Sequence, residues 1–278
     1  MRRVLLEVGI FKLYTFGVFM ALGMIAAILV AYSEAKRKKM DPDKFLEFSL
    51  CALILGLVGA RVAYVLTSDP TYFAAHPLEV LRVDLGGLSV HGAIFGGTAA
   101  GIWFSRRQKI SFWRLADAVA PGLILGQAIG RIGCDVFGYP MARPAFWGVY
   151  VGGLILHPTQ VYEFLLDYLI FAFLWSHRNR TKYEGQLFVE YLFLFSMARG
   201  VVEFFRINPM VWGPFSIAHV ASLLLVLTAV ASHLWLSRLP AQSPAANFDR
   251  DWPIWLTGLV TAAMIVASIA LYYGFPPP

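Results

Sequence analysis

The sequence predicts an all-α fold, a polytopic membrane helical bundle, and three observations support this prediction. Hydrophobic residues make up 58% of the 278 residues and charged residues only 14%, whereas soluble domains contain about 25% charged residues. Apolar runs long enough to span a bilayer core recur along the chain. Basic clusters follow alternate runs, as the positive-inside rule requires of a multi-pass membrane protein.

The first two runs set the predicted orientation. Residues 13–32 form the first run, and the basic cluster at residues 36–39 follows directly. This cluster is the strongest in the chain, so we expect it in the cytoplasm and the N-terminus outside. The second run, residues 45–66, returns outward. An external loop follows, with expected helix breakers at Pro70, Pro77 and Asp84.

The next five runs continue the alternation. They cover residues 88–104, 115–129, 158–175, 186–205 and 215–235. Basic residues follow the third, fifth and seventh runs, which predicts that those ends lie inside. Residues 131–156 are rich in Gly, Pro and aromatic residues and have no helical period. We expect this segment to be a partly embedded external loop.

The chain then departs from a simple seven-helix pattern. Residues 239–251 are polar and contain Pro240, Ser243 and Pro244, which predicts a linker. The linker separates a transmembrane domain, residues 1–238, from an extra C-terminal segment, residues 252–278. That segment contains an apolar run long enough for an eighth span.

Composition also excludes several classes of function. The net charge of +6 lies mostly in short clusters between apolar runs, which indicates membrane topology and affinity for anionic lipid headgroups. The sequence contains no basic stripe interleaved with aromatic residues, so it does not predict nucleic-acid binding. Cys51 and Cys134 provide neither a disulfide framework nor a metal-ligand cluster. The first run is too long for a cleavable signal peptide.

The stretch Gly126 to Gly138 contains the most informative residue, Arg131. A cation at the edge of a membrane span is costly unless it has a partner or faces a wet cavity. Gly130 and Gly133 flank Arg131 and leave room for a lipid headgroup or for another backbone.

Other ionisable residues fall at the same outer depth in the remaining spans. They are Arg61, His91, Glu163, Arg199, Glu203, Arg206 and His219. The spacing of Arg199, Glu203 and Arg206 places them on one helix face. They form either one intrahelical ion pair with a snorkelling end residue, or an anion site in which Glu203 orients Arg199.

Each of the remaining polar residues has a structural and a functional interpretation. Arg61 either snorkels outward or joins the site, and His91 is either a hydrogen-bonded packing residue or a general base. The run from His157 to Glu163 caps and anchors the fifth helix, and these two residues also support the site in the functional interpretation. Asp117 is structural, and Cys134 is a weak candidate nucleophile.

Together these residues predict a cavity that is open to the outer leaflet and lined by arginines. The planar guanidinium group suits a phosphate oxyanion, so the natural ligand is an anionic phospholipid. These arguments do not separate a transferase from a flippase or a lipid-binding scaffold. A transporter is disfavoured because the inner halves of the spans are almost wholly apolar.

Five motifs in this order resemble the prolipoprotein diacylglyceryl transferase family. They are GARVAYVL around Arg61, GGLSVHGAIFGG around His91, DAVAPGLILGQAIGRIG ending beyond Arg131, HPTQVYE ending at Glu163, and ARGVVEFFRINP around Arg199. The resemblance covers residues 16–224 and implies seven family-type spans within residues 1–238, a transferase-like domain. The span within residues 252–278 is additional.

The resemblance also implies a reaction. The diacylglyceryl group of phosphatidylglycerol moves to the lipobox cysteine of a prolipoprotein, and glycerol phosphate leaves. Arg131 and Arg199 would stabilise charge on the leaving group, and His91 would accept the thiol proton. The expected substrate-binding residues are Arg61, Glu203, Arg206, Gly130, Gly133, His157 and Glu163. No metal or organic cofactor is expected, and the implied location is the bacterial inner membrane.

The sequence departs from the family pattern at several polar positions. The departures are Phe16, Cys134, Phe137, Tyr139, Phe195 and His219. They leave open an alternative function, that of a divergent paralogue that binds anionic phospholipid or lipoprotein without catalysis.

Overall fold

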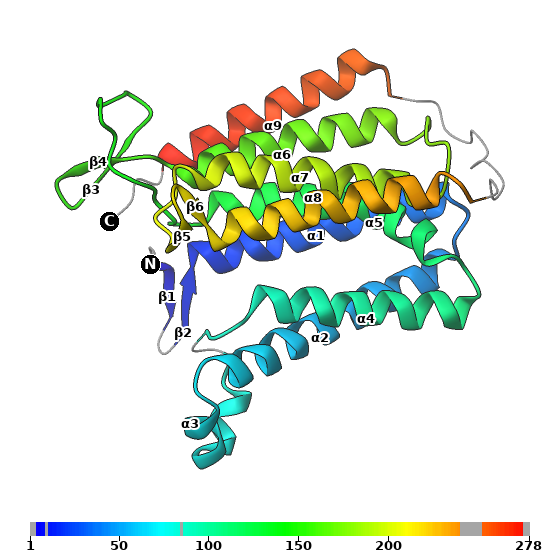
Figure 1. Ribbon diagram of the computed structural model, residues 1–278, viewed down its shortest axis with the longest axis horizontal. Helices are drawn as coiled ribbons and strands as arrows, with labels where there is room; N and C mark the ends of the chain where they lie inside the picture. The colour runs from blue at the N-terminus through cyan, green and yellow to red at the C-terminus, as the bar shows by residue number, and fades with distance from the viewer. Residues whose placement is uncertain (1–3, 9–10, 84–85, 240–251, 275–278) are drawn as a thin grey trace. The chain divides into compact units, whose positions relative to one another are not determined.

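The computed structural model describes residues 4–8, 11–83, 86–239 and 252–274. These residues form two compact units, one within residues 1–34 and 117–278 and the other within residues 35–116. Long helices dominate both units (Figure 1). Their bounds are α1 Thr15–Arg37, α2 Pro42–Thr67, α4 Val90–Gln108, α5 Phe112–Ile132, α6 Thr159–His177, α7 Gln186–Glu203, α8 Ile217–Leu236 and α9 Ile254–Gly274.

Each predicted apolar run coincides with one of these long helices, so the prediction of a helical membrane protein is confirmed. Among the described residues, five helices are long and apolar enough to cross a membrane: α1, α2, α5, α8 and α9. The other three have similar lengths, but α6 and α7 carry carboxylates such as Glu163 and Glu190 within their runs. The count of seven spans plus an eighth stays a prediction.

Three short β-hairpins accompany the helices of this mostly α-helical fold. They pair β1 Val4–Val8 with β2 Phe11–Tyr14, β3 Val149–Val151 with β4 Leu154–Leu156, and β5 Met210–Trp212 with β6 Phe215–Ser216. All three lie at the same end of their unit (Figure 1). Gly152 and Gly153 turn the second hairpin with φ angles of 57° and 86°, which a two-residue hairpin turn requires. The segment predicted as an irregular loop therefore contains a strand pair.

The predicted external loop differs from expectation in a second way. Pro70 and Pro77 do not interrupt helices but begin two short ones, α3 Pro70–Ala75 and the 3-10 helix η1 Pro77–Leu81. Proline is favoured in the first helical turn because its missing N–H would have no partner there. Asp84 and, apart from Leu239, the predicted linker lie outside the described residues.

Glycine allows α1 and α5 to approach closely. A Cβ atom on Gly126 would lie 2.8 Å from the carbonyl oxygen of Gly23, and one on Gly133 would lie 3.0 Å from Cα of Phe16. A Cβ atom on Gly130 would lie 3.0 Å from Sδ of Met20. Small residues at such spacing drive helix association in lipid. The glycines of the Arg131 stretch thus accommodate a neighbouring helix, which was one of the two sequence-based alternatives.

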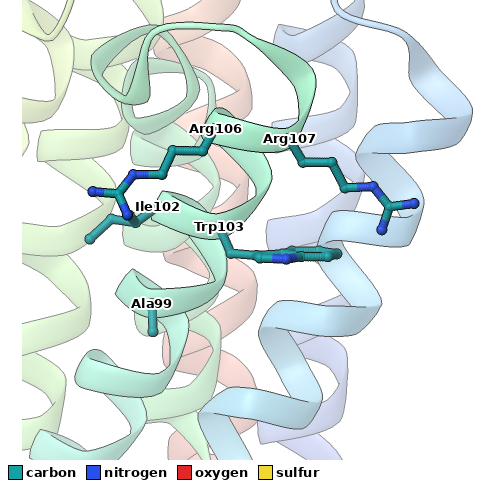
Figure 2. Close-up of a pocket in the computed structure, with 5 residues that line it drawn as sticks. All are labelled: Ala99, Ile102, Trp103, Arg106 and Arg107. Carbon is teal, nitrogen blue, oxygen red and sulfur yellow. The ribbon is translucent and has the colours of Figure 1, made fainter.

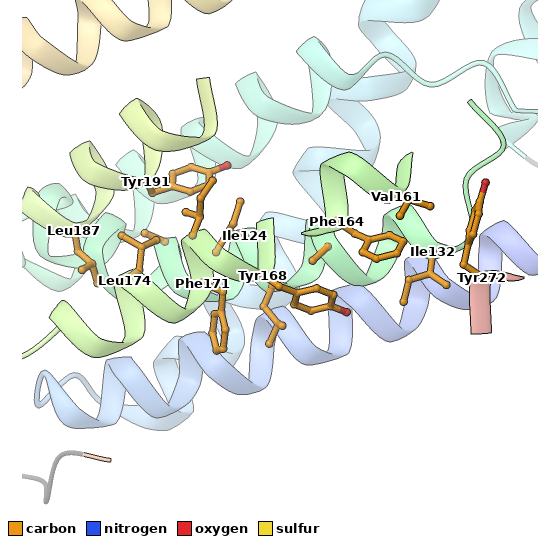
Figure 3. Close-up of a cluster of buried hydrophobic side chains, with 14 of the residues drawn as sticks. Ile124, Ile132, Val161, Phe164, Tyr168, Phe171, Leu174, Leu187, Tyr191 and Tyr272 are labelled. Atoms are coloured by element: carbon orange, nitrogen blue, oxygen red, sulfur yellow. The ribbon is translucent and has the colours of Figure 1, made fainter. Parts of the chain in front are cut away.

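A buried apolar cluster joins α5, α6, α7 and α9 (Figure 3). Phe164, Leu174 and Leu187 are completely buried in it, and Tyr272 contributes from α9. By contrast, Leu223, Leu224 and Leu227 of α8 are each more than half exposed. An apolar exterior around a packed interior suits a helix bundle surrounded by lipid.

Polar contacts also join the ends of α1, α6 and α7. Arg178 pairs with Glu34, with Nε 3.1 Å from Oε1, and both side chains are buried. The carboxylate of Asp117 accepts hydrogen bonds from the backbone N–H groups of Gly185 and Phe188, at 2.9 and 3.0 Å. Such bonds satisfy helix N-terminal donors that have no intrahelical partner. The structural interpretation of Asp117 is therefore supported, because this residue caps α7.

We predict that Asp117→Ala lowers the free energy of unfolding by about 3 kcal/mol, because it leaves two buried N–H groups unpaired. The control is Asp41→Ala, since Asp41 caps α2 at an exposed position, where loss of a cap costs about 1 kcal/mol. Unfolding of both variants in the same detergent measures the difference. Equal shifts would contradict the role of Asp117.

Candidate active site

Five charged residues from three helices and one loop meet in the first unit. Arg131 comes from the last turn of α5, Glu163 from the start of α6, and Arg199 and Glu203 from the end of α7. Arg206 follows α7. We call these five residues the arginine cluster. Sequence reasoning predicted all five as site residues, and the structure brings them together.

Glu163 lies at the centre of the arginine cluster. Its Oε2 atom is 2.7 Å from Nε of Arg131, and its Oε1 atom is 3.4 Å from Nη1 of Arg199. Nη1 of Arg206 donates a hydrogen bond to the same Oε1 atom at 3.2 Å. Only 6% of the Glu163 side chain is exposed. A buried carboxylate persists only with such compensation, so Glu163 and the arginines fix one another.

Glu203 forms the second anchor of the arginine cluster. Its Oε2 atom is 2.7 Å from Nη1 of Arg199 and 3.6 Å from Nε of Arg206. Its Oε1 atom accepts hydrogen bonds from Oγ of Ser216 at 2.6 Å and from Nδ2 of Asn208 at 2.5 Å. The expected pairing of Glu203 with Arg199 is therefore present, and both carboxylate oxygens of Glu203 have partners.

The arginines remain more accessible than the carboxylates that hold them. Exposed fractions of the side chains are 30% for Arg131, 20% for Arg199 and 15% for Arg206, whereas Glu203 has none. Each guanidinium group has five N–H donors, and the ion pairs use only some of them. The arginine cluster can therefore offer hydrogen bonds and positive charge to an anion without losing its internal support.

Sequence reasoning missed Asp167. This residue is buried one turn beyond Glu163 on α6 and interacts electrostatically with both Glu163 and Arg131. The signal was available, because the spacing of Glu163 and Asp167 places two carboxyl groups on one face of a membrane helix.

Backbone hydrogen bonds hold the loops beside the arginine cluster. The N–H of Gly138 donates to the carbonyl of His157 at 2.8 Å, and the N–H of Tyr139 donates to the carbonyl of Phe205 at 2.9 Å. Gly138 also forms a β-bridge with Arg206. A side chain at Gly138 would collide with the carbonyl of Phe205, so a glycine is required there.

The His157 side chain lies in a chain of polar contacts. Its Nδ1 atom is 3.0 Å from Oη of Tyr162, and Nε1 of Trp147 donates to the same Oη at 3.2 Å. Burial lowers the pKa of His157, so a neutral ring that accepts the Tyr162 proton fits this arrangement. His157 thus anchors the start of α6, as its structural interpretation proposed.

Arg61 belongs to the second unit and is buried. Its Nε donates to the carbonyl of Val80 at 2.8 Å, and its Nη1 donates to the carbonyls of Gly86 and Gly87, both at 2.9 Å. Its Nη2 donates to the carbonyl of Glu79. This geometry favours a bracing role for Arg61 over headgroup contact, because backbone carbonyls occupy its donors.

His91 also belongs to the second unit. It lies in the first turn of α4, two residues after Ser89, the N-cap residue. Its side chain is exposed. The catalytic role of His91 stays a prediction.

Departures from the family pattern have become packing or capping residues. Cys134 is buried with Sγ 3.6 Å from the carbonyl oxygen of Gly130. Phe137 packs against the buried cluster, and Phe195 stacks on Tyr191 with ring centroids 5.8 Å apart. His219 accepts a hydrogen bond from the backbone N–H of Ser216 at 3.0 Å and caps α8.

A separate pocket lies along the end of α4 in the second unit (Figure 2). Its lining residues are Ala99, Ile102, Trp103, Arg106 and Arg107. The guanidinium carbon of Arg107 is 5.2 Å from the Trp103 ring centroid, a cation–π contact. The lining includes none of the predicted site residues. Elsewhere in the described residues, no group of three or more His, Cys, Asp or Glu residues is arranged to hold a metal ion.

We predict that Glu163→Ala lowers the free energy of unfolding by about 3–5 kcal/mol, because it leaves three partly buried arginines without their shared partner. The control is Glu79→Ala, since the Glu79–Arg82 pair is partly exposed and its loss costs less than about 1 kcal/mol. Unfolding in one detergent measures both. Similar shifts would contradict the central position of Glu163.

Comparison with known proteins agrees with the resemblance. A family model described as prolipoprotein diacylglyceryl transferase matches residues 3–235. A protein of Clostridioides difficile (strain 630) named phosphatidylglycerol–prolipoprotein diacylglyceryl transferase is 37% identical over 225 residues, which cover 80% of this chain and 90% of the relative.

Relatives with the same name occur in other bacteria. The protein of Nostoc sp. (strain PCC 7120) is 35% identical, with 84% of this chain and 88% of the relative covered. The protein of Bacillus cereus (strain G9842) is 32% identical, with 82% and 89% covered. The chain therefore belongs to the prolipoprotein diacylglyceryl transferase family.

Proposed function

We propose that this chain transfers the diacylglyceryl group of phosphatidylglycerol to the lipobox cysteine thiol of prolipoproteins and releases glycerol phosphate. Family membership and the names of the relatives support this reaction. The single observation that carries it is the arginine cluster, in which three arginines are held by two buried glutamates at the ends of α5, α6 and α7. The alternative of a non-catalytic paralogue is not favoured.

The arginine cluster suits a phosphate leaving group. When the bond between the diacylglyceryl carbon and the phosphate oxygen breaks, negative charge grows on the leaving glycerol phosphate. Preorganised cations stabilise such charge strongly in a site of low dielectric constant. We assign this role to Arg131 and Arg199, and Arg206 contributes to headgroup binding. Glu163 and Glu203 position these guanidinium groups and need not touch the lipid.

The acceptor thiol must lose its proton, because the thiolate is the nucleophile. The new carbon–sulfur bond replaces the carbon–oxygen bond, and the electron pair of the broken bond leaves on the phosphate oxygen. We assign the thiol proton to His91, because histidine is the side chain that most often acts as a general base near neutral pH. The reaction needs no metal or organic cofactor.

The other predicted binding residues have supporting roles in this proposal. Arg61 braces the backbone at Val80, Gly86 and Gly87, and His157 anchors the start of α6. Gly130 and Gly133 allow α1 to pack closely beside Arg131. These residues position the groups that bind the lipid.

We further propose that the protein lies in the bacterial cytoplasmic membrane with its N-terminus outside and the arginine cluster facing the outer leaflet. The basic residues at the ends of α1 and α4, such as Arg37 and Arg107, support this orientation. In this arrangement α1, α2, α4 to α8 and α9 are the seven family-type spans and the eighth.

We predict that purified protein, given phosphatidylglycerol and a lipobox peptide, forms a diacylglyceryl adduct on the peptide cysteine. His91→Ala and Arg131→Ala should each lower the rate about 100-fold or more, because each removes a proton acceptor or a stabilising charge. Mass spectrometry of the peptide measures the adduct.

The control is Arg107→Ala, which removes an arginine from the pocket at the end of α4 and should retain the normal rate. Normal rates in both the His91 and the Arg131 variants would contradict the assigned roles. Wild-type protein that binds the lipid but forms no adduct would contradict the proposed reaction.

A further inference from the structure

Helix α9 lies beyond the segment that the family model matches, which ends at residue 235. It nevertheless packs along α6 within the first unit (Figure 1). Its buried residues are Thr257, Thr261, Ser268 and Tyr272. Their spacing places them on one helical face. Because all four carry hydroxyl groups, α9 presents a polar stripe to the bundle and apolar residues elsewhere.

Two residues of the polar stripe make hydrogen bonds to α6. Oγ of Ser268 is 2.8 Å from Oη of Tyr168, and Nε2 of Gln160 donates to Oη of Tyr272 at 2.6 Å. At the other end, the rings of Trp252 and Trp175 lie 5.9 Å apart. A membrane helix that served only as an anchor would need no such bonds, since lipid satisfies an apolar surface. Helix α9 is therefore docked in one orientation.

Tyr272 reaches the part of α6 that carries the central carboxylate of the arginine cluster. Gln160 is completely buried, and it precedes Glu163 by one helical turn. The Tyr272 ring packs against Phe164, the residue after Glu163, with centroids 6.3 Å apart. Figure 3 shows Tyr272 at the end of the buried cluster that also contains Phe164 and Ile132, the neighbour of Arg131.

Gln160 depends on Tyr272. The hydroxyl of Tyr272 is the partner of its side-chain Nε2, and its Oε1 atom is buried without a hydrogen bond to any described residue. Without the hydroxyl, a buried amide would lose its hydrogen bond, which is costly. The first turn of α6 would move to find a new partner, and Glu163 would move with it. A displacement of about 1 Å is enough to weaken catalysis strongly.

We propose that α9 is a working part of the transferase and that Tyr272 is a positioning residue for the arginine cluster. Tyr272 fixes the start of α6 through Gln160 and Phe164, and Glu163 then fixes the three arginines. The inference rests on the proposed function, because its effect on turnover requires that the chain be a transferase.

The test compares wild-type protein with Tyr272→Phe and Ser268→Ala in nanodiscs. Each variant loses one hydroxyl hydrogen bond between α9 and α6, so Ser268→Ala is the matched control for docking alone. Transfer to a lipobox peptide gives the turnover number. The melting temperature of each protein is also measured in phosphatidylcholine and in phosphatidylglycerol nanodiscs. Its rise in phosphatidylglycerol reports lipid binding and does not require turnover.

We expect Tyr272→Phe to lower the turnover number about fivefold, the effect of losing one typical hydrogen bond. It should also at least halve the phosphatidylglycerol-dependent rise in melting temperature. Ser268→Ala should lower the melting temperature in both lipids and preserve the turnover number and the phosphatidylglycerol-dependent rise.

Two results would overturn the inference: Tyr272→Phe without either effect, or equal effects in both variants, which would limit α9 to general docking. Failure of the proposed function is distinguishable, because wild-type protein would then form no adduct. In that case the phosphatidylglycerol-dependent rise decides the inference by itself.

Discussion

The sharing of one buried carboxylate among three arginines is the interaction on which the site depends. Glu163 contacts Arg131, Arg199 and Arg206, which come from different segments of the chain. In a medium of low dielectric constant, none of these charges is stable without the others. The same carboxylate that stabilises the fold therefore fixes the positions of the cations, and a phosphate group meets a preorganised set of donors.

Close helix packing makes this arrangement possible. Glycines on α5 bring α1 against the segment that ends at Arg131, and backbone hydrogen bonds between loops hold the segment around Arg206. Polar contacts from α9 hold the start and the middle of α6. Since lipid provides no hydrophobic driving force for helix association, close packing of small residues and hydrogen bonds hold the helices together. Several features that differ from the family pattern serve the same packing, including Phe137 and Phe195.

The chain also illustrates why charged residues in membrane helices need partners from elsewhere in the sequence. Arg199 and Glu203 pair within α7, and local spacing accounts for that contact. Glu203 also accepts hydrogen bonds from Asn208 in the following loop and from Ser216 at the start of the next helix. Arg61 illustrates the opposite outcome, in which backbone carbonyls of one loop satisfy a buried cation. Similar residues at similar predicted depths thus perform different tasks.

The sequence by itself determined the helical membrane class, the eight long helices and the members of the arginine cluster, because hydrophobic length, basic clusters and motif spacing are local properties. It did not predict the hairpins, although two adjacent glycines, Gly152 and Gly153, are typical of the turn that joins the strands of one of them. Only the tertiary structure decided that Glu163 is central, that Gly130 and Gly133 face a helix, and that α9 reaches Gln160. These are contacts between distant segments, and local sequence patterns carry no information on which partners meet.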